Sequence, residues 1–111
     1  MVNIKLIKND SRYFWTNHSK SKLIQYNLSP SIVRKTINWP ERTEYGIAPN
    51  TTALMIRKDT KKSKREIWVM IQKKLEDKGR RIKIISAWIY PGVSPKEKEI
   101  FIPEDVWEEI K

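Results

Sequence analysis

The chain has 111 residues, about the size of one ordinary domain, and its 23 Lys and Arg against 13 Asp and Glu give a net charge of +10. The sequence contains no cysteine, which excludes disulfides, thiolate metal sites and cysteine nucleophiles. No apolar run approaches the roughly 20 residues of a membrane span, and lysines interrupt any signal-peptide stretch near the start. We therefore expect one domain over residues 1–111, cytoplasmic and without a membrane partner.

The N-terminal segment predicts extended chain followed by a short helix. Residues 4–7 and 12–15 are rich in β-forming side chains, so both are expected to be extended. A helix is predicted to begin near Thr16 or Ser19 and to end at Asn27, because asparagine tolerates the left-handed conformation that terminates helices.

A second helix is predicted directly after the first. Ser29 can cap its N–H groups, Pro30 suits its first position, and Pro40 ends it. Apolar and β-branched residues recur at i,i+4, which predicts one buried stripe. The stripe consists of Ile32, Val33, Thr36 and Ile37.

The pattern that follows is typical of an antiparallel meander. Strands are predicted at residues 51–58, 65–74 and 81–90, with polar turns at residues 59–64 and 76–79. Apolar residues occupy both alternating faces of the second and third strands. This pattern predicts central strands that are covered on both sides or by helices on one face.

A last helix is predicted to begin after Pro103, with Glu104 and Asp105 in its positively polarised first turn. The residues expected to face the core are Ile102, Val106 and Ile110. Helices that precede an antiparallel sheet are typical of an α+β fold. We expect one or two N-terminal helices packed on a mostly antiparallel sheet of three to five strands, with a short C-terminal helix.

The positive charge is concentrated in the first 95 residues. Residues 96–111 hold three lysines and six acids, which leaves 20 basic and 7 acidic residues before them, or +13. An excess of this size favours a polyanion through counterion release and long-range steering. No basic amphipathic helix suits a membrane surface, so we expect RNA as the partner, bound on a single positive surface with the only histidine at its edge.

His18 is that histidine, and it lies near the start of the first predicted helix. An imidazole with an ordinary pKa of ~6.5 can act as base or acid at neutral pH. Lys20 and Lys22 would place cations beside it, and the N–H groups of the helix start would favour a phosphate. The alternative is a surface or capping residue, which a lone histidine at a helix start usually is.

Arg42 follows the end of the second predicted helix. Its guanidinium could hold a phosphate bidentately and stabilise charge that develops on the phosphate oxygens. It could equally form a surface ion pair with Glu41 or Glu44.

The densest basic run lies on the predicted turn between the first two strands of the meander. Such a run could follow a nucleic-acid backbone, although a solvated turn that protects an edge strand would have the same composition. The expected phosphate-binding residues are Lys22, Arg57, Lys61, Lys62, Lys64 and Arg65.

Most of the aromatic residues are expected in the core. Trp68 and Trp88 lie within apolar strands, and Trp107 lies in the last helix. Tyr90 is the exception, because it ends a strand before a turn and its hydroxyl could exchange a proton. One histidine and scattered carboxylates form no metal-ligand spacing, and no glycine-rich phosphate loop occurs, so we expect neither a metal nor a cofactor.

Several short motifs follow one another over residues 12–90. They are a Thr-x-His helix start, Tyr26-x-Leu28-Ser29 before a second helix, Thr36-Ile37-x-x-Pro40-Glu41-Arg42, and then three strands. This order resembles a bacterial and phage group of domain-of-unknown-function relatives of the RelE and BrnT toxins, in the barnase–EndoU–colicin–RelE class. The resemblance implies a metal-independent ribonuclease fold, often toxin-like and sometimes only RNA- or partner-binding. The family's helix-start histidine falls on His18, and the arginine after its proline falls on Arg42.

If the chain cleaves RNA, a base takes the 2′-OH proton, the oxygen attacks the adjacent phosphate, and an acid protonates the leaving 5′-oxygen. We predict His18 as base or acid, Arg42 with Lys20 or Lys22 as charge stabilisers, and Tyr90 as a proton partner. Two other hypotheses are a non-catalytic RNA- or ribosome-binding module, and a mobile-element accessory protein that binds an acidic protein such as an antitoxin.

Overall fold

The protein has an α+β fold in which three α-helices pack on one five-stranded sheet. The computed structural model describes residues 2–76, 79–96 and 98–110. In chain order the elements are a 3-10 helix η1 (Ile4–Leu6), β1 (Tyr13–Trp15), α1 (Asn17–Tyr26), α2 (Pro30–Asn38), β2 (Arg42–Tyr45), β3 (Thr51–Arg57), β4 (Arg65–Glu76), β5 (Gly79–Pro91) and α3 (Glu104–Ile110). No helix among the described residues is long and apolar enough to cross a bilayer.

The N-terminal segment confirms the first predicted helix and corrects part of the extended region. The side chain of Thr16 caps α1 by accepting the N–H of Ser19 at 3.0 Å, and Asn27 ends the helix with a left-handed φ of 55°. Residues 4–6 form η1 instead of a strand. The side-chain oxygen of Asn3 accepts the N–H of Lys5 at 3.0 Å, and this local bond outweighs the β-propensity of the segment.

Helix α2 also begins and ends as predicted. The Ser29 hydroxyl accepts the N–H of Ile32 at 3.2 Å, and Pro30 occupies the first turn. Val33 and Thr36 are fully buried, and Ile32 packs against the same core, so the predicted stripe is confirmed.

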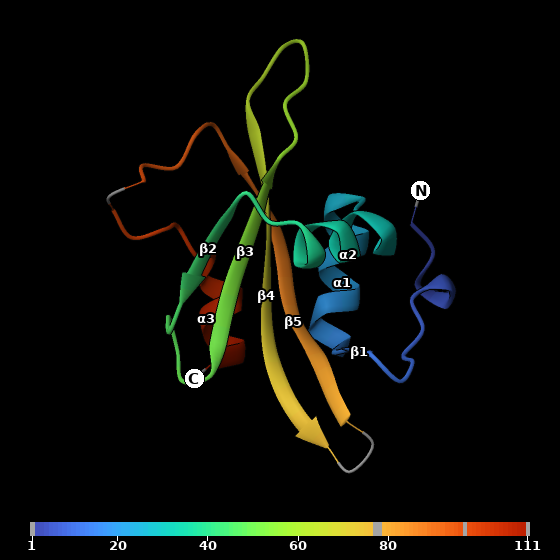
Figure 1. Cartoon of the computed structure of the whole chain (residues 1–111). Coiled ribbons are helices and arrows are strands. Elements are labelled where there is room, and N and C mark those ends of the chain that lie inside the picture. The colour runs from blue at the N-terminus through green and yellow to red at the C-terminus, as the bar shows by residue number, and fades with distance from the viewer. Residues whose placement is uncertain (1, 77–78, 97, 111) are drawn as a thin grey trace.

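The sheet has the strand order β1-β5-β4-β3-β2, and only β1 runs parallel to its neighbour (Figure 1). The three predicted strands of the meander are confirmed as β3, β4 and β5, whereas β2 was missed. β2 is a four-residue edge strand of sequence RTEY, which lacks the apolar alternation that identifies a strand. Residues 77 and 78 of the predicted second turn lie outside the described residues.

Both faces of the sheet are covered, which confirms one of the two predicted arrangements. α1 and α2 pack on one face, where Leu23 and Val33 contact the cluster that includes Val69. α3 and the segment before it pack on the opposite face, over Trp68 and Trp88. The two indole rings stack with centroids 6.2 Å apart and planes at 8°.

α3 presents Val106 to this second core, with Ile102 and Ile110 beside it, as predicted. The expectation that Trp107 lies in the core is wrong, because its exposed fraction is 38%. Successive residues of a helix point about 100° apart, so a buried Val106 turns Trp107 toward the surface.

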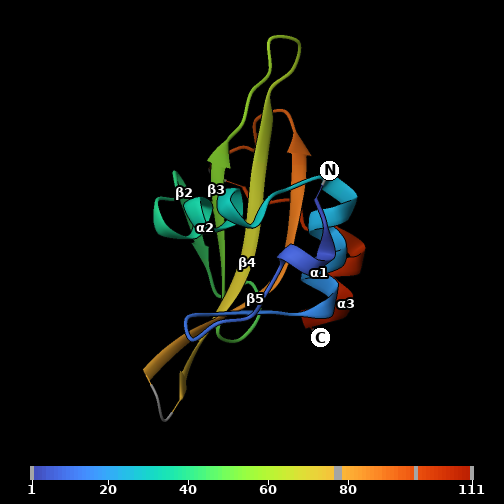
Figure 2. The same ribbon diagram turned by 90° about the vertical axis from the view of Figure 1, so that its right-hand side faces the viewer.

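α1 and α3 lie side by side along β5 (Figure 2) and are joined by a buried lysine. Lys22 is only 5% exposed; its ammonium forms an ion pair with Asp105 and donates to Gln25 Oε1 at 2.8 Å. Burial alone would raise the pKa of Asp105, but the hydrogen bond and charge of Lys22 outweigh burial and lower it.

We expect the Lys22–Asp105 contact to be lost in acid. Because the folded pKa of Asp105 lies below its unfolded value, the ionised carboxylate stabilises the fold above that value, and the stabilisation disappears as the pH falls through the folded pKa. Urea unfolding between pH 6 and pH 2 should show wild type about 1 kcal/mol more stable than Asp105→Asn near neutrality, with the gap closing in acid. A gap that stays constant over this range would contradict the assignment.

Candidate nucleic-acid interface

The connection between β3 and β4 is the most basic surface segment of the described chain and projects from one end of the sheet (Figure 1). Residues 58–65, here called the basic loop, hold five cations and one acid, or +4. Its exposed lysines are Lys58, Lys61, Lys62 and Lys64. None of these four lysines forms an ion pair with a described residue.

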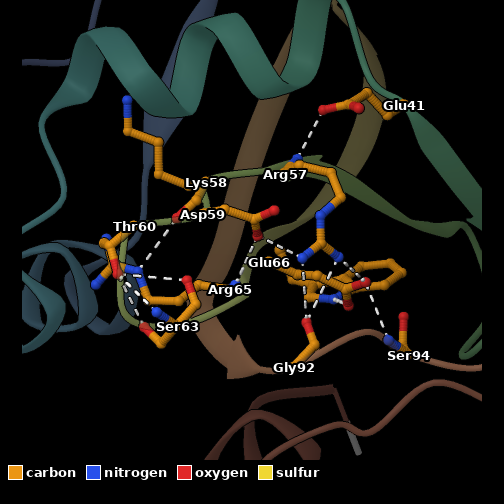
Figure 3. Close-up of polar contacts among 11 residues, drawn as sticks. Glu41, Arg57, Lys58, Asp59, Thr60, Ser63, Arg65, Glu66, Gly92 and Ser94 are labelled. Atoms are coloured by element: carbon orange, nitrogen blue, oxygen red, sulfur yellow. Dashed lines mark hydrogen bonds and ion pairs between the residues drawn. The ribbon is translucent and has the colours of Figure 1, made fainter.

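The backbone of the basic loop is held by its own short polar side chains (Figure 3). Thr60 N–H donates to the Ser63 carbonyl at 2.8 Å, and Ser63 N–H donates back to Thr60 Oγ1 at 3.1 Å. The Asp59 carboxylate accepts the N–H of Arg65 at 3.0 Å, and Lys58 N–H donates to the Arg65 carbonyl at 2.9 Å. These bonds order the turn without using a lysine ammonium.

A buried carboxylate supports the base of the loop. Glu66 is 1% exposed, and its Oε2 accepts from Arg57 Nη1 at 3.1 Å and from Ser94 N–H at 3.0 Å (Figure 3). Its Oε1 accepts from Trp68 Nε1 at 3.0 Å. A buried charge is tolerated when it is paired and hydrogen-bonded in this way, and the network joins β3, β4 and the segment after β5.

Arg57, one of the predicted phosphate-binding residues, belongs to this network. Its guanidinium also contacts Asp59 and the Gly92 carbonyl, at 3.5 Å for the latter. The hydrogen bond from Arg57, followed by the N–H of Arg65, lowers the pKa of Asp59. Arg57 therefore stabilises the base of the loop through these contacts. The exposed lysines of the loop are the cations that can contact a ligand.

A groove of about 680 Å³ adjoins the loop on the α2 side of the sheet. Lys58 and Arg65 line it together with apolar residues such as Leu28, Ile67 and Ile89. Lys58 and Arg65, at the base of the loop, therefore border this concave surface, whereas the other lysines of the loop lie at its exposed tip.

His18 lies elsewhere, between α1, β5 and α3. Its Nε2 is 3.0 Å from Ser86 Oγ and its Nδ1 is 3.4 Å from Glu109 Oε1, while its side chain is 15% exposed. Ser86 is fully buried, so this hydroxyl does not reach the surface as a nucleophile. His18 therefore does not lie at the edge of the basic loop.

Arg42 lies on the edge strand β2 and points across the sheet. It pairs with Glu44 at 3.2 Å, donates to Ser94 Oγ at 2.9 Å and lies 5.5 Å from the Trp68 ring centroid. The predicted alternative of a pair with Glu44 is therefore confirmed.

The structure does not bring the predicted catalytic residues together. The strands that carry Arg42 and Tyr90 are three spacings of about 4.8 Å apart, or roughly 14 Å, and His18 packs against β5 beyond them. The ring of Tyr90 packs on Phe101 with centroids 6.1 Å apart. Lys20 is half-buried on α1, and Lys22 is buried against Asp105, so Lys22 is not the exposed cation that was predicted.

A second group of cations lies at the other end of β4 and β5, and sequence reasoning did not single it out. Residues 73–83 hold six cations and two acids, or +4, which equals the net charge of the basic loop spread over a longer segment. The members described with side chains, here called the distal cluster, are Lys73, Arg80, Arg81 and Lys83. Arg81 lies 5.2 Å from the centroid of the Phe14 ring. The net charge of residues 73–83 could have identified this group from the sequence. The segment was instead interpreted only as two strands and a turn.

Comparison with known families, curated proteins and solved structures finds no match to this chain. The resemblance to the RelE and BrnT group therefore stays a prediction from sequence.

Proposed function

We propose that this protein binds RNA through the basic loop, as a non-catalytic module that contacts the phosphodiester backbone. The observation that carries the proposal is the ordered turn whose four exposed lysines have no acidic partner among the described residues. Ammonium groups carried on such an ordered turn release the counterions of a nucleic acid when they bind it, with little ordering of the backbone. Backbone contacts of this kind carry no base specificity.

Binding is favoured over cleavage because, among the described residues, the predicted base, acid and cations do not surround one accessible position. His18 is held by Ser86 and Glu109, away from the basic loop. Two carboxylates lie at the loop base. Asp59 is held by Arg57 and by the N–H of Arg65, and Glu66 is buried and already accepts three hydrogen bonds. A metal-independent ribonuclease needs such groups around the scissile phosphate.

Fluorescence anisotropy with a labelled 20-nucleotide single-stranded RNA in EDTA tests the proposal. If four lysines contact phosphates, log K should fall with log salt with a slope of about −3, because each contact contributes about 0.7. His18→Ala should bind like wild type, and gel analysis should show the RNA intact. Affinity that is weak and independent of salt would contradict RNA binding and point to an acidic protein partner. Cleavage that disappears in His18→Ala would favour the nuclease.

A further inference from the structure

The two basic segments lie at opposite ends of one long hairpin. β4 begins at the basic loop and runs for 12 residues toward the distal cluster, and Figure 1 shows the two ends at opposite extremes of the molecule. Arg65 and Lys73 are eight residues apart on this strand, which corresponds to roughly 26 Å at about 3.3 Å per residue. The lysine tip lies farther still, in a molecule whose longest dimension is 44 Å.

The two ends are electrostatically separate. Charges farther apart than the Debye length of about 8 Å at physiological salt are largely screened from each other. Between the ends, residues 67–71 and 84–88 of β4 and β5 are buried and uncharged. On one face they are covered by α3, which contributes four acids and no cation. The acids of α3 disfavour phosphate where they are exposed, so α3 offers no continuous basic track between the loop and the distal cluster.

The distal cluster also differs from the basic loop in chemistry. Phe14 is 37% exposed and lies opposite Lys83 in the pairing of β1 with β5. The guanidinium of Arg81 lies over the same ring. A partly exposed ring between cations can stack an unpaired base while the cations contact its phosphates. The basic loop carries no aromatic residue.

We infer that each end binds its own segment of single-stranded RNA, so that one molecule bridges two strands. This inference rests on the proposed function, since it assumes that the basic loop binds RNA. It adds a second RNA-binding site at the distal cluster. It also adds an activity, because one molecule would hold two RNA strands apart by about the long dimension of the protein.

Energy transfer between two short RNAs tests bridging directly. Hexauridylate carrying a donor is mixed with an equal amount of hexauridylate carrying an acceptor, and wild-type protein is titrated in. Transfer should rise and then fall, because excess protein leaves one strand per molecule. Two variants each remove one end: Lys61/Lys62/Lys64→Gln at the loop and Lys73/Arg80/Lys83→Gln at the distal cluster. Each should still bind RNA by anisotropy, with half the stoichiometry, while transfer falls at least tenfold.

Lys5/Lys8/Lys35→Gln is the matched control, because it removes the same charge from three exposed lysines outside both ends and should give wild-type transfer. Wild type that binds one hexauridylate per molecule without transfer would overturn bridging and leave the proposed function standing. Transfer that survives in either one-ended variant would also overturn it, because two associated copies of the chain could then carry the strands. Absence of any RNA binding would overturn both proposals.

Discussion

Glu66→Ala is expected to lower the free energy of unfolding by about 3–5 kcal/mol, the usual cost of breaking a buried ion pair from one side. The substitution removes the acceptor of three hydrogen bonds at once. It leaves the buried indole N–H of Trp68 and the backbone N–H of Ser94 without a partner, and it removes one of the two carboxylates that hold Arg57. Unsatisfied buried donors add to the loss of the charge pair.

Urea unfolding followed by tryptophan fluorescence measures this effect. Glu44→Ala is the control, since Glu44 pairs with Arg42 from a side chain that is 38% exposed and should cost about 0–1 kcal/mol. Glu66→Gln should fall between the two, because the amide oxygen still accepts a hydrogen bond although the charge is lost. A Glu66→Ala variant as stable as Glu44→Ala would mean that the buried network contributes nothing to the fold.

Lys61/Lys62/Lys64→Gln is expected to lower the affinity of the basic loop itself for single-stranded RNA about 100-fold at 0.1 M salt. The estimate follows from three lost phosphate contacts, each worth about 0.7 in the slope of log K against log salt, so the slope should also become shallower by about 2. The glutamines keep a polar side chain, one atom shorter than that of lysine, and remove its charge. The turn itself should persist, because Thr60, Ser63 and Asp59 make its hydrogen bonds.

Amide chemical shifts of Thr60 and Ser63 during titration with hexauridylate report this affinity at the loop, whatever binds at the other end of the sheet. Lys5/Lys8/Lys35→Gln lowers the net charge by the same three units and should change the loop affinity less than about threefold, because none of these lysines belongs to the loop. Equal losses in both triple variants would show that net charge, and not the loop, determines binding.

The buried network links these two predictions. Glu66 holds Arg57, and Arg57 and the N–H of Arg65 together hold Asp59, which closes the base of the loop (Figure 3). Loss of Glu66 should therefore loosen the turn that presents the lysines, and part of the RNA affinity should be lost with it.

The ends of the first two helices were predicted from residues within one helical turn of each end. Thr16 and Ser29 each accept an N–H three residues ahead, and Asn27 takes the left-handed conformation, so these ends depend only on immediate neighbours. The long strands were predicted for a similar reason, since β4 and β5 are longer and more apolar than their surroundings. The α+β class follows from these elements in their order.

Pairings between distant segments were decided by tertiary structure alone. β1 lies parallel to β5 through contacts such as Tyr13 with Ile82, and β2 is a strand because β3 offers it an edge. Local propensity does not indicate that β1 pairs with β5 or that β2 pairs with β3. Glu66 is ionisable and has no local feature that indicates burial, yet Arg57, Trp68 and Ser94 converge on it from different parts of the chain.

The sequence by itself determined that the protein carries a surplus of cations and that one dense run lies on a turn. Only the fold decided where the surplus is found: β4 and β5 carry two basic segments to opposite ends, and α1 turns His18 toward β5 and α3. The physical reason is that charge is counted along the chain, whereas binding surfaces depend on distances in space, which strand pairing and burial determine.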